Sequence, residues 1–183
     1  MPHNVRHVAL IVGSLRAESL NRKIAQYVCD IAPARWQISE IEIGDLPLYD
    51  QGRDEEPIEA YERVRGQLAA ADAVLIITPE HNRSIPAALK NVLDIASRPA
   101  GRSVWTGKKA ALITASPGTY GGISCGLHVR QILQSLGVSV LVAPELYLSR
   151  VTEALDAEGK VADARTQTAL KKWVQALDNW LVG

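Results

Sequence analysis

What this sequence lacks excludes several classes of protein. Its longest apolar runs, such as 73–78 and 110–115, fall far short of the roughly 20 residues that a membrane-spanning helix needs. With 20 basic and 20 acidic residues it has no net charge, and it has no basic tract, so nothing in its charge favours nucleic-acid binding. Residues 1–7 contain no apolar signal segment and no small-residue cleavage site, which predicts a cytoplasmic protein.

Cysteine is also scarce. Cys29 and Cys125 are the only two, and they lack the CxxC spacing of a zinc or thiol-redox site. We expect two free thiols in a reducing compartment. Cys125 lies near a predicted helix start, where a thiol pKa can fall, but no His or Asp pattern accompanies it, so packing in the core is the favoured interpretation.

What is present points to one α/β domain spanning residues 1–183. The length suits a single core, and 47% hydrophobic with 22% charged residues is ordinary for a globular chain. Short apolar runs alternate with stretches of helical spacing, the pattern of parallel strands joined by crossover helices. Strands are expected at 7–12, 36–43, 73–78, 109–115 and 138–142, with helices from 20 to about 31, 58–71, 86–97, a fourth ending at Gly137, and 164–181.

These elements predict a doubly wound, five-stranded parallel sheet with helices on both faces. In such sheets ligands bind beyond the carboxyl ends of the strands, at a point where the strand order reverses. Three loops that follow predicted strands are therefore candidates for the functional site.

The first candidate loop, residues 13–21, leaves a strand and enters a helix. Ser14, Ser19 and Asn21 offer side-chain hydrogen bonds, Arg16 offers a cation, and the helix start offers unpaired amides, which together suit one phosphate. The loop lacks both GxxxxGK[ST] and GxGxxG, so neither a nucleoside-triphosphate loop nor a dinucleotide fingerprint is supported. The alternative is that Ser19 only caps the helix and Arg16 lies on the surface.

The second candidate loop, residues 78–86, has a proline on each side of a polar turn, which should make it stiff. Fixed backbone polar groups suit the edge of a flat heteroaromatic ring. The alternative is an ordinary loop in which Asn82 and Ser84 make turn contacts. His81 has no second His at ligand spacing, so ring stacking or capping is favoured over a catalytic acid or a metal ligand.

The third candidate loop, residues 116–122, is rich in glycine, which permits close backbone approach and positive φ angles. Ser116 adds a hydroxyl and Tyr120 a stacking face. By itself this loop predicts little.

Together the three loops resemble the NADPH-dependent FMN reductase family, which includes bacterial chromate and quinone reductases of flavodoxin-like fold. The similarity lies in GSLRxxSxN at 13–21, TPExNxSIPxxLKNxxDxxSR at 78–98, and ASPGxxGG at 115–122 followed by LHVRQ and Pro144-Glu145. The resemblance implies FMN as cofactor, NADPH or NADH as donor, strand order 2-1-3-4-5, and a dimer or tetramer with the helix after Pro86 near the subunit contact. Two residues depart from the family pattern: His81 replaces a Tyr, and Arg83 a small or aromatic residue.

The resemblance also implies a set of cofactor-binding residues, with the flavin rather than any side chain carrying the chemistry. The phosphate would be held at the first loop and the isoalloxazine ring between the other two. The residues implied are Ser14, Arg16, Ser19, Leu20, Asn21, Pro79, Glu80, His81, Asn82, Ser84, Ser116 and Gly118.

The function implied is reduction of small acceptors, such as quinones, flavins, azo compounds or chromate, by a two-step hydride transfer. A non-catalytic electron carrier like flavodoxin is the alternative, but the sequence lacks a Thr-rich phosphate loop and a strongly acidic charge. A third possibility is an FMN-binding sensor without turnover.

Overall fold

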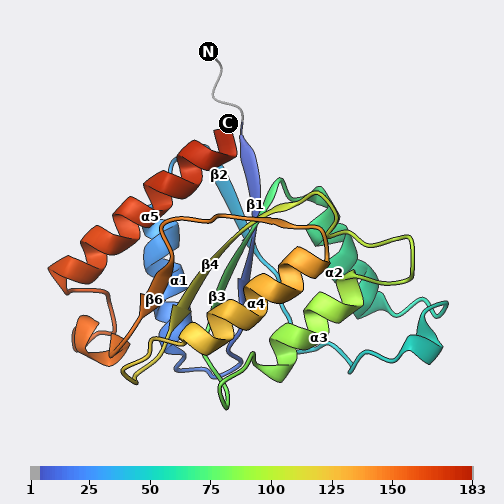
Figure 1. Ribbon diagram of the computed structural model, residues 1–183, viewed down its shortest axis with the longest axis horizontal. Helices are drawn as coiled ribbons and strands as arrows, with labels where there is room; N and C mark the ends of the chain where they lie inside the picture. Colours follow the sequence, from blue (N-terminus) through green and yellow to red (C-terminus); the bar gives the residue numbers. More distant parts are fainter. Residues whose placement is uncertain (1–4, 183) are drawn as a thin grey trace.

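A six-stranded parallel sheet forms the centre of the molecule in this computed structural model, which describes residues 5–182 (Figure 1). Residues 1–7 were used above to predict that the chain has no signal peptide, and residues 1–4 of that segment lie outside the described residues. The strands are β1 (Arg6–Val12), β2 (Trp36–Glu40), β3 (Ala73–Thr78), β4 (Lys109–Ala115), β5 (Ser139–Val140) and β6 (Leu146–Leu148). Their order is β2-β1-β3-β4-β5, with β6 also paired to β4, which confirms the 2-1-3-4-5 order.

Helices cover both faces of the sheet, as predicted. Helices α1 (Leu20–Asp30) and α5 (Ala164–Val182) lie on one face, and α2 (Glu59–Ala70), α3 (Ala87–Ala96) and α4 (Ile123–Ser135) lie on the other (Figure 1). Two short 3-10 helices, η1 (Gln51–Arg53) and η2 (Val151–Ala154), lie in connections. None of the helices in residues 5–182 is long and apolar enough to cross a membrane.

The core has two halves, one on each face of the sheet, because successive strand residues point to opposite faces. Val8, Leu10 and Val12 pack toward α1 and α5, whereas Ala9 and Ile11 pack toward α2, α3 and α4. All six residues of β3 are buried, as its continuous apolar run predicts. The apolar stripe of α5 is also buried, namely Leu170, Trp173, Val174, Leu177 and Leu181.

The predicted second strand is too long. The structure ends β2 at Glu40 rather than Ile43, although the Ile41 amide still donates to the Leu10 carbonyl at 2.8 Å. Beyond that point Ile41 and Ile43 are buried under α2 without continuing the ladder. The prediction failed because burial, not strand pairing, produced the apolar pattern.

The predicted fifth strand, 138–142, is wrong in extent. Instead of one strand beside β4, the structure has two short ones: β5 pairs with the start of β4, and β6 pairs with the end of β4. Between them Val142 is 80% exposed, and Pro144 has no backbone N–H group to donate to a strand ladder. A three-residue strand such as β6 is too short to show a period, so no pattern in the residues could indicate it.

Two apolar residues of α4 are not in the core: Ile123 is 39% exposed and Leu127 is 53% exposed. The buried side of α4 instead contains Cys125, Gly126, Val129 and Leu133.

Candidate functional site

Three loops follow the carboxyl ends of the adjacent strands β1, β3 and β4, and they meet along one edge of the sheet, at the lower edge of Figure 1. The β1–α1 loop is held directly against β3. The Gly13 amide donates to the Ile77 carbonyl at 2.9 Å, and a Cβ on Gly13 would lie 2.2 Å from Thr78 Oγ1. Ser14, the next residue, is only 6% exposed.

The first turn of α1 presents two buried polar side chains. Ser19 is the N-cap, and its Oγ accepts the Arg22 amide at 3.3 Å, so the capping alternative is observed. The hydroxyl hydrogen is still available to donate to an anion. Asn21, 3% exposed, donates from Nδ2 to the Ala115 carbonyl at 3.2 Å, which ties α1 to the end of β4.

Asn21 also provides an unusual feature. Its Oδ1 is buried, and no hydrogen-bond partner for it is found among the described residues. Buried polar atoms in native proteins are nearly always satisfied, so such an atom needs an explanation. A ligand with a donor group at the start of α1 would supply one.

The charges of the β1–α1 loop leave room for an anion. Arg16 is exposed, and no ion pair involving it occurs within residues 5–182. The Glu18 side chain is 83% exposed and lies 3.5 Å from Lys23 Nζ, so its charge is directed to solvent. Leu20 is partly buried against the α1 and α5 half of the core. Its role is therefore packing as well as the placement of a backbone amide.

The β3–α3 loop contains a tight two-residue turn. His81 and Ser84 exchange backbone hydrogen bonds of 3.0 and 2.8 Å, and the residues between them, Asn82 and Arg83, have φ angles of 49° and 65°. Positive φ at both central residues defines a type I′ turn. This turn restricts the loop backbone in addition to its prolines. Ser84 makes turn contacts, as the alternative interpretation proposed, and Asn82 occupies a central position of the turn.

Glu80 has a structural role that the sequence did not reveal. Its Oε2 accepts the Cys125 amide at 3.0 Å, in the first turn of α4. Gly122, the N-cap of that helix, has no side chain to do so. The carboxylate therefore caps α4 across the site, and the positive end of the helix favours its negative charge. No local motif could predict this, because cap and helix are 45 residues apart.

Cys125 packs in the core, as predicted. It is fully buried, and burial raises the pKa of its thiol to about 12, against a partial opposing effect from its hydrogen bond with Thr78. The thiol is neutral at physiological pH and is not a nucleophile. Both cysteines are free.

The β4–α4 loop is fixed by the segment that follows β6. The Ser116 amide donates to the Leu148 carbonyl at 3.0 Å, and the Gly118 carbonyl accepts the Arg150 amide at 3.0 Å. The Ser116 hydroxyl lies 3.4 Å from the Gly118 carbonyl. Tyr120 is 63% exposed, so its ring is available as the stacking face that the sequence suggested.

The long connection after β2 lies beside the same edge. Asn91 of α3 accepts the Tyr49 amide at 2.8 Å and donates to the Pro47 carbonyl at 2.9 Å. Leu15 lies next to Gly44, where a Cβ would be 3.3 Å from Leu15 Cδ2. Asn91 was assigned no role from the sequence. The available signal was a polar residue within an otherwise buried helical stripe.

His128 was likewise missed. Its Nδ1 lies 3.0 Å from Ser84 Oγ, which joins α4 to the β3–α3 loop. His81, in contrast, is exposed, and Pro79 is partly buried beside Thr78. No cluster of three or more His, Cys, Asp or Glu that could hold a metal occurs in residues 5–182.

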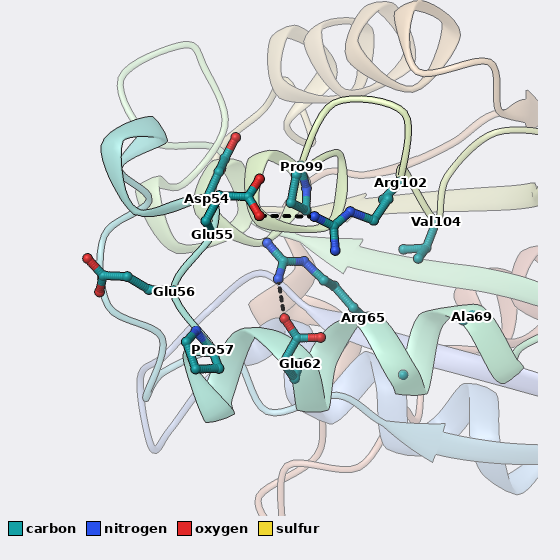
Figure 2. Close-up of a pocket in the computed structure, with 11 residues that line it drawn as sticks. Asp54, Glu55, Glu56, Pro57, Glu62, Arg65, Ala69, Pro99, Arg102 and Val104 are labelled. Carbon is teal, nitrogen blue, oxygen red and sulfur yellow. Dashed lines mark hydrogen bonds and ion pairs between the residues drawn. The ribbon is translucent and has the colours of Figure 1, made fainter.

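A separate hollow of about 460 Å³ lies away from these loops, between α2 and the connections at 54–57 and 99–104 (Figure 2). None of the predicted site residues lines it. Its charged side chains pair with one another, Arg65 with Glu62 at 2.6 Å and Arg102 with Glu55 at 3.4 Å. Because its arginines are already paired, the hollow is a weaker candidate for an ionic ligand than the loop edge.

Taken together, the loops at this edge offer an anion cradle at the start of α1 and, beside it, two fixed segments with polar backbone groups. Contacts between Gly13 and Thr78, and between Asn21 and Ala115, join the cradle to both neighbouring strands. The arrangement suits a ligand with a phosphate at one end and a flat polar ring at the other.

Comparison with known proteins agrees with this geometry. The model of the NADPH-dependent FMN reductase family matches residues 6–153. A quinone reductase of Pseudomonas putida is 43% identical over 178 residues, covering 97% of this chain and 95% of that protein. A 2-hydroxy-1,4-benzoquinone reductase of a Burkholderia species is 37% identical over 174 residues, with 95% of each chain covered.

A solved structure is similar over nearly the whole chain. The flavoenzyme NAD(P)H:(acceptor) oxidoreductase of Paracoccus denitrificans superimposes with a TM-score of 0.91 at 38% identity, covering 97% of both chains.

Proposed function

This chain belongs to the NADPH-dependent FMN reductase family, and from that membership and the geometry of the loop edge we propose how it works as an oxidoreductase. It is an NAD(P)H-dependent flavoenzyme whose cofactor is FMN and whose acceptors are quinones and similar small molecules. Its fold is flavodoxin-like, with the cofactor edge formed by the loops after β1, β3 and β4.

The start of α1 holds the FMN phosphate in this proposal. Ser14 and Ser19 donate their hydroxyl hydrogens, Arg16 supplies the cation, and the amides of Leu20 and Asn21 point from the helix N-terminus. Asn21 Oδ1 is an acceptor, so it would take a hydroxyl hydrogen from the sugar-alcohol chain of the cofactor and would not contact the phosphate. The observation that carries the proposal is that the buried residues Ser14 and Ser19 lie in the same loop-to-helix segment as the exposed Arg16. This donor set fits a phosphate bearing two negative charges.

The two neighbouring loops hold the ring. Pro79, Glu80, His81, Asn82 and Ser84 form one side, and Ser116 with Gly118 forms the other. The type I′ turn and the hydrogen bonds to Leu148 and Arg150 keep both backbones rigid without the ligand. Rigid loops present their polar groups at little entropic cost when the ring binds.

Bound there, FMN would supply the redox chemistry that links hydride donation by NAD(P)H to reduction of the acceptor. The residues of the chain bind and orient the ring, cover one of its faces, and leave the other open to donor and acceptor in turn. No side chain needs to act as a nucleophile, in keeping with the buried, neutral Cys125 thiol.

We extend the proposal in three respects. Flavins, azo compounds and oxyanions such as chromate are further acceptors, which a screen of turnover measures. The chain forms a dimer or tetramer whose subunit contact lies near α3. Exposed Ile123 and Leu127 on α4 and the hollow between α3 and α4 support this proposal. Analytical sedimentation measures the size of the assembly. It acts in the cytoplasm, which cell fractionation measures.

The proposed function has a direct test. The purified protein should be yellow, NADPH should bleach it without oxygen, and a quinone should restore the colour. Arg16→Gln should weaken FMN binding by about tenfold to a hundredfold, the loss expected for one charge-assisted hydrogen bond. Titration of the apoprotein by flavin fluorescence measures this.

Arg102→Gln is the matched control, because it removes an exposed arginine from the distant hollow. FMN affinity should be unchanged in that variant. Equal losses in both variants, or a colourless protein that ignores added FMN, would contradict the proposal.

A further inference from the structure

Arg83 occupies a costly position. Its φ of 65° lies in the left-handed region, which disfavours a non-glycine residue that lacks a short polar side chain. Glycine usually fills this place in a type I′ turn. The backbone strain at Arg83 therefore needs an explanation, and the contacts of its side chain offer one.

The Arg83 side chain joins two of the three loops. Its guanidinium carbon lies 4.6 Å from the centroid of the Tyr120 ring, and its Nη1 lies 3.6 Å from Glu80 Oε1. Tyr120 comes from the β4–α4 loop, whereas Arg83 and Glu80 come from the β3–α3 loop. The cation therefore lies between the two loops that flank the ring site.

Glu80 does not fully neutralise this cation. Its other carboxylate oxygen already caps α4 at the Cys125 amide, and its side chain is only 12% exposed. The Arg83 side chain is 63% exposed, and a guanidinium has five N–H donors. Donors are thus left free to meet a solute that approaches from solvent.

Arg83 and Tyr120 together offer a flat stacked surface and a fork of N–H donors at one point. Such a surface matches a planar ring that carries a carboxylate, sulfonate or oxyanion, because the fork binds two oxygens at once. A neutral ring gains the stacking alone.

We propose that Arg83 is a specificity-determining residue that selects quinones bearing an anionic substituent, an inference that rests on the proposed function. The anionic group is not altered in the reaction. The quinone takes up two electrons and two protons to become the quinol, with one hydride from NAD(P)H and one proton from water.

The test compares 1,4-naphthoquinone with its 2-sulfonate on the holoenzyme, in wild type, Arg83→Gln, Arg83→Lys and the charge-matched control Arg102→Gln. The two quinones differ in intrinsic reactivity. The quantity compared between variants is therefore kcat/KM for the 2-sulfonate divided by kcat/KM for 1,4-naphthoquinone. Arg83→Gln should lower that ratio about tenfold through the sulfonate alone, the effect of losing one charge-assisted contact. Arg83→Lys should restore part of it, since charge returns without the planar fork.

A binding readout accompanies turnover. The dissociation constant of 2-naphthalenesulfonate, which cannot be reduced, should rise about tenfold in Arg83→Gln, measured by the change in flavin absorbance. The effect should shrink as salt is raised. Arg102→Gln should match wild type in both readouts.

Two results would overturn the proposal. One is an unchanged ratio and an unchanged sulfonate dissociation constant in Arg83→Gln. The other is a change confined to the preference for NADPH over NADH, which would assign the guanidinium to the 2′-phosphate of the donor. A holoenzyme that reduced neither quinone would contradict the proposed function instead, and the sulfonate titration would still test Arg83.

Discussion

Gly13 allows the β1–α1 loop to approach β3. A Cβ there would meet Thr78 Oγ1 at 2.2 Å, Thr78 Cβ at 2.7 Å and the Thr78 Cα at 3.3 Å. Rotation of the threonine could move its hydroxyl but not its Cβ or its backbone. The close approach of the β1–α1 loop to β3 therefore depends on the absence of a Cβ at Gly13.

Gly13→Ala should destabilise the protein by about 1–3 kcal/mol, the usual range for overpacking a filled site. Gly66→Ala is the control with the opposite sign. Gly66 lies in α2, and a Cβ there would have no heavy atom within 4 Å, so alanine should stabilise by about 0.5–1 kcal/mol through helix propensity. Urea unfolding of both variants measures the difference, and a Gly13→Ala protein as stable as wild type would refute the close contact.

Single residues also show where sequence reasoning works. Ser19 was weighed as a helix cap from its type and position, and it is one. Glu80 and Asn91 were not assigned their contacts, because each bonds a segment more than 40 residues away. Local pattern carries no information about such partners.

At the scale of elements, α5 depends on its first turn. The Thr166 hydroxyl and the Thr166 amide each donate to Asp163 Oδ2 at 2.7 Å. The hydroxyl bond, and then the amide bond, hold the pKa of Asp163 below its ordinary value of 3.8. A lowered folded pKa adds stability that is present above pH 3.8 and is lost as pH falls through the folded value.

Asp163→Asn should therefore flatten the acid side of the stability curve. An asparagine oxygen still caps the helix, so the loss near neutral pH should be small, but the amide does not titrate. Melting temperatures measured from about pH 5 down to about pH 2.5 should fall less steeply in the variant. Parallel curves for the two proteins would show that the cap carries no charge-dependent stability.

Two strands were predicted to the residue, whereas the bounds of α1, α2, α3 and α5 were predicted to within one residue. The bounds of β3 and β4 match the expected 73–78 and 109–115 because both strands are continuous apolar runs. The 138–142 run contains β5, then the buried Leu141, whose amide still donates to the Ala110 carbonyl at 2.9 Å, and then the exposed Val142, where pairing has ended. An apolar pattern indicates which residues are buried. Which of them pair with a neighbouring strand must be inferred from that burial.

At the scale of the whole molecule, the fold places the three candidate loops at one end of the sheet. Strand order was not readable from alternation and came from family resemblance, yet the ligand edge followed from a rule for all doubly wound sheets. The loops were expected to meet because each follows a parallel strand, and β1, β3 and β4 are neighbours in the sheet.

FMN should stabilise the whole chain by mass action. At about a hundred times its dissociation constant a ligand adds about 2.7 kcal/mol, which for a chain of this size raises the melting temperature by about 5–10 °C. Riboflavin, which lacks the phosphate, should give a much smaller shift at the same concentration. Circular dichroism melts of the apoprotein measure both, and equal shifts would show that the α1 cradle does not hold the phosphate.

The division of the outer strand into β5 and β6 has a consequence for behaviour in a crowded solution. A long, regular outer strand exposes a row of backbone donors and acceptors on which another polypeptide can add. Here that row is interrupted at Pro144, and neither piece exceeds three residues. The margin beside β4 is thus poorly suited to recruit foreign strands.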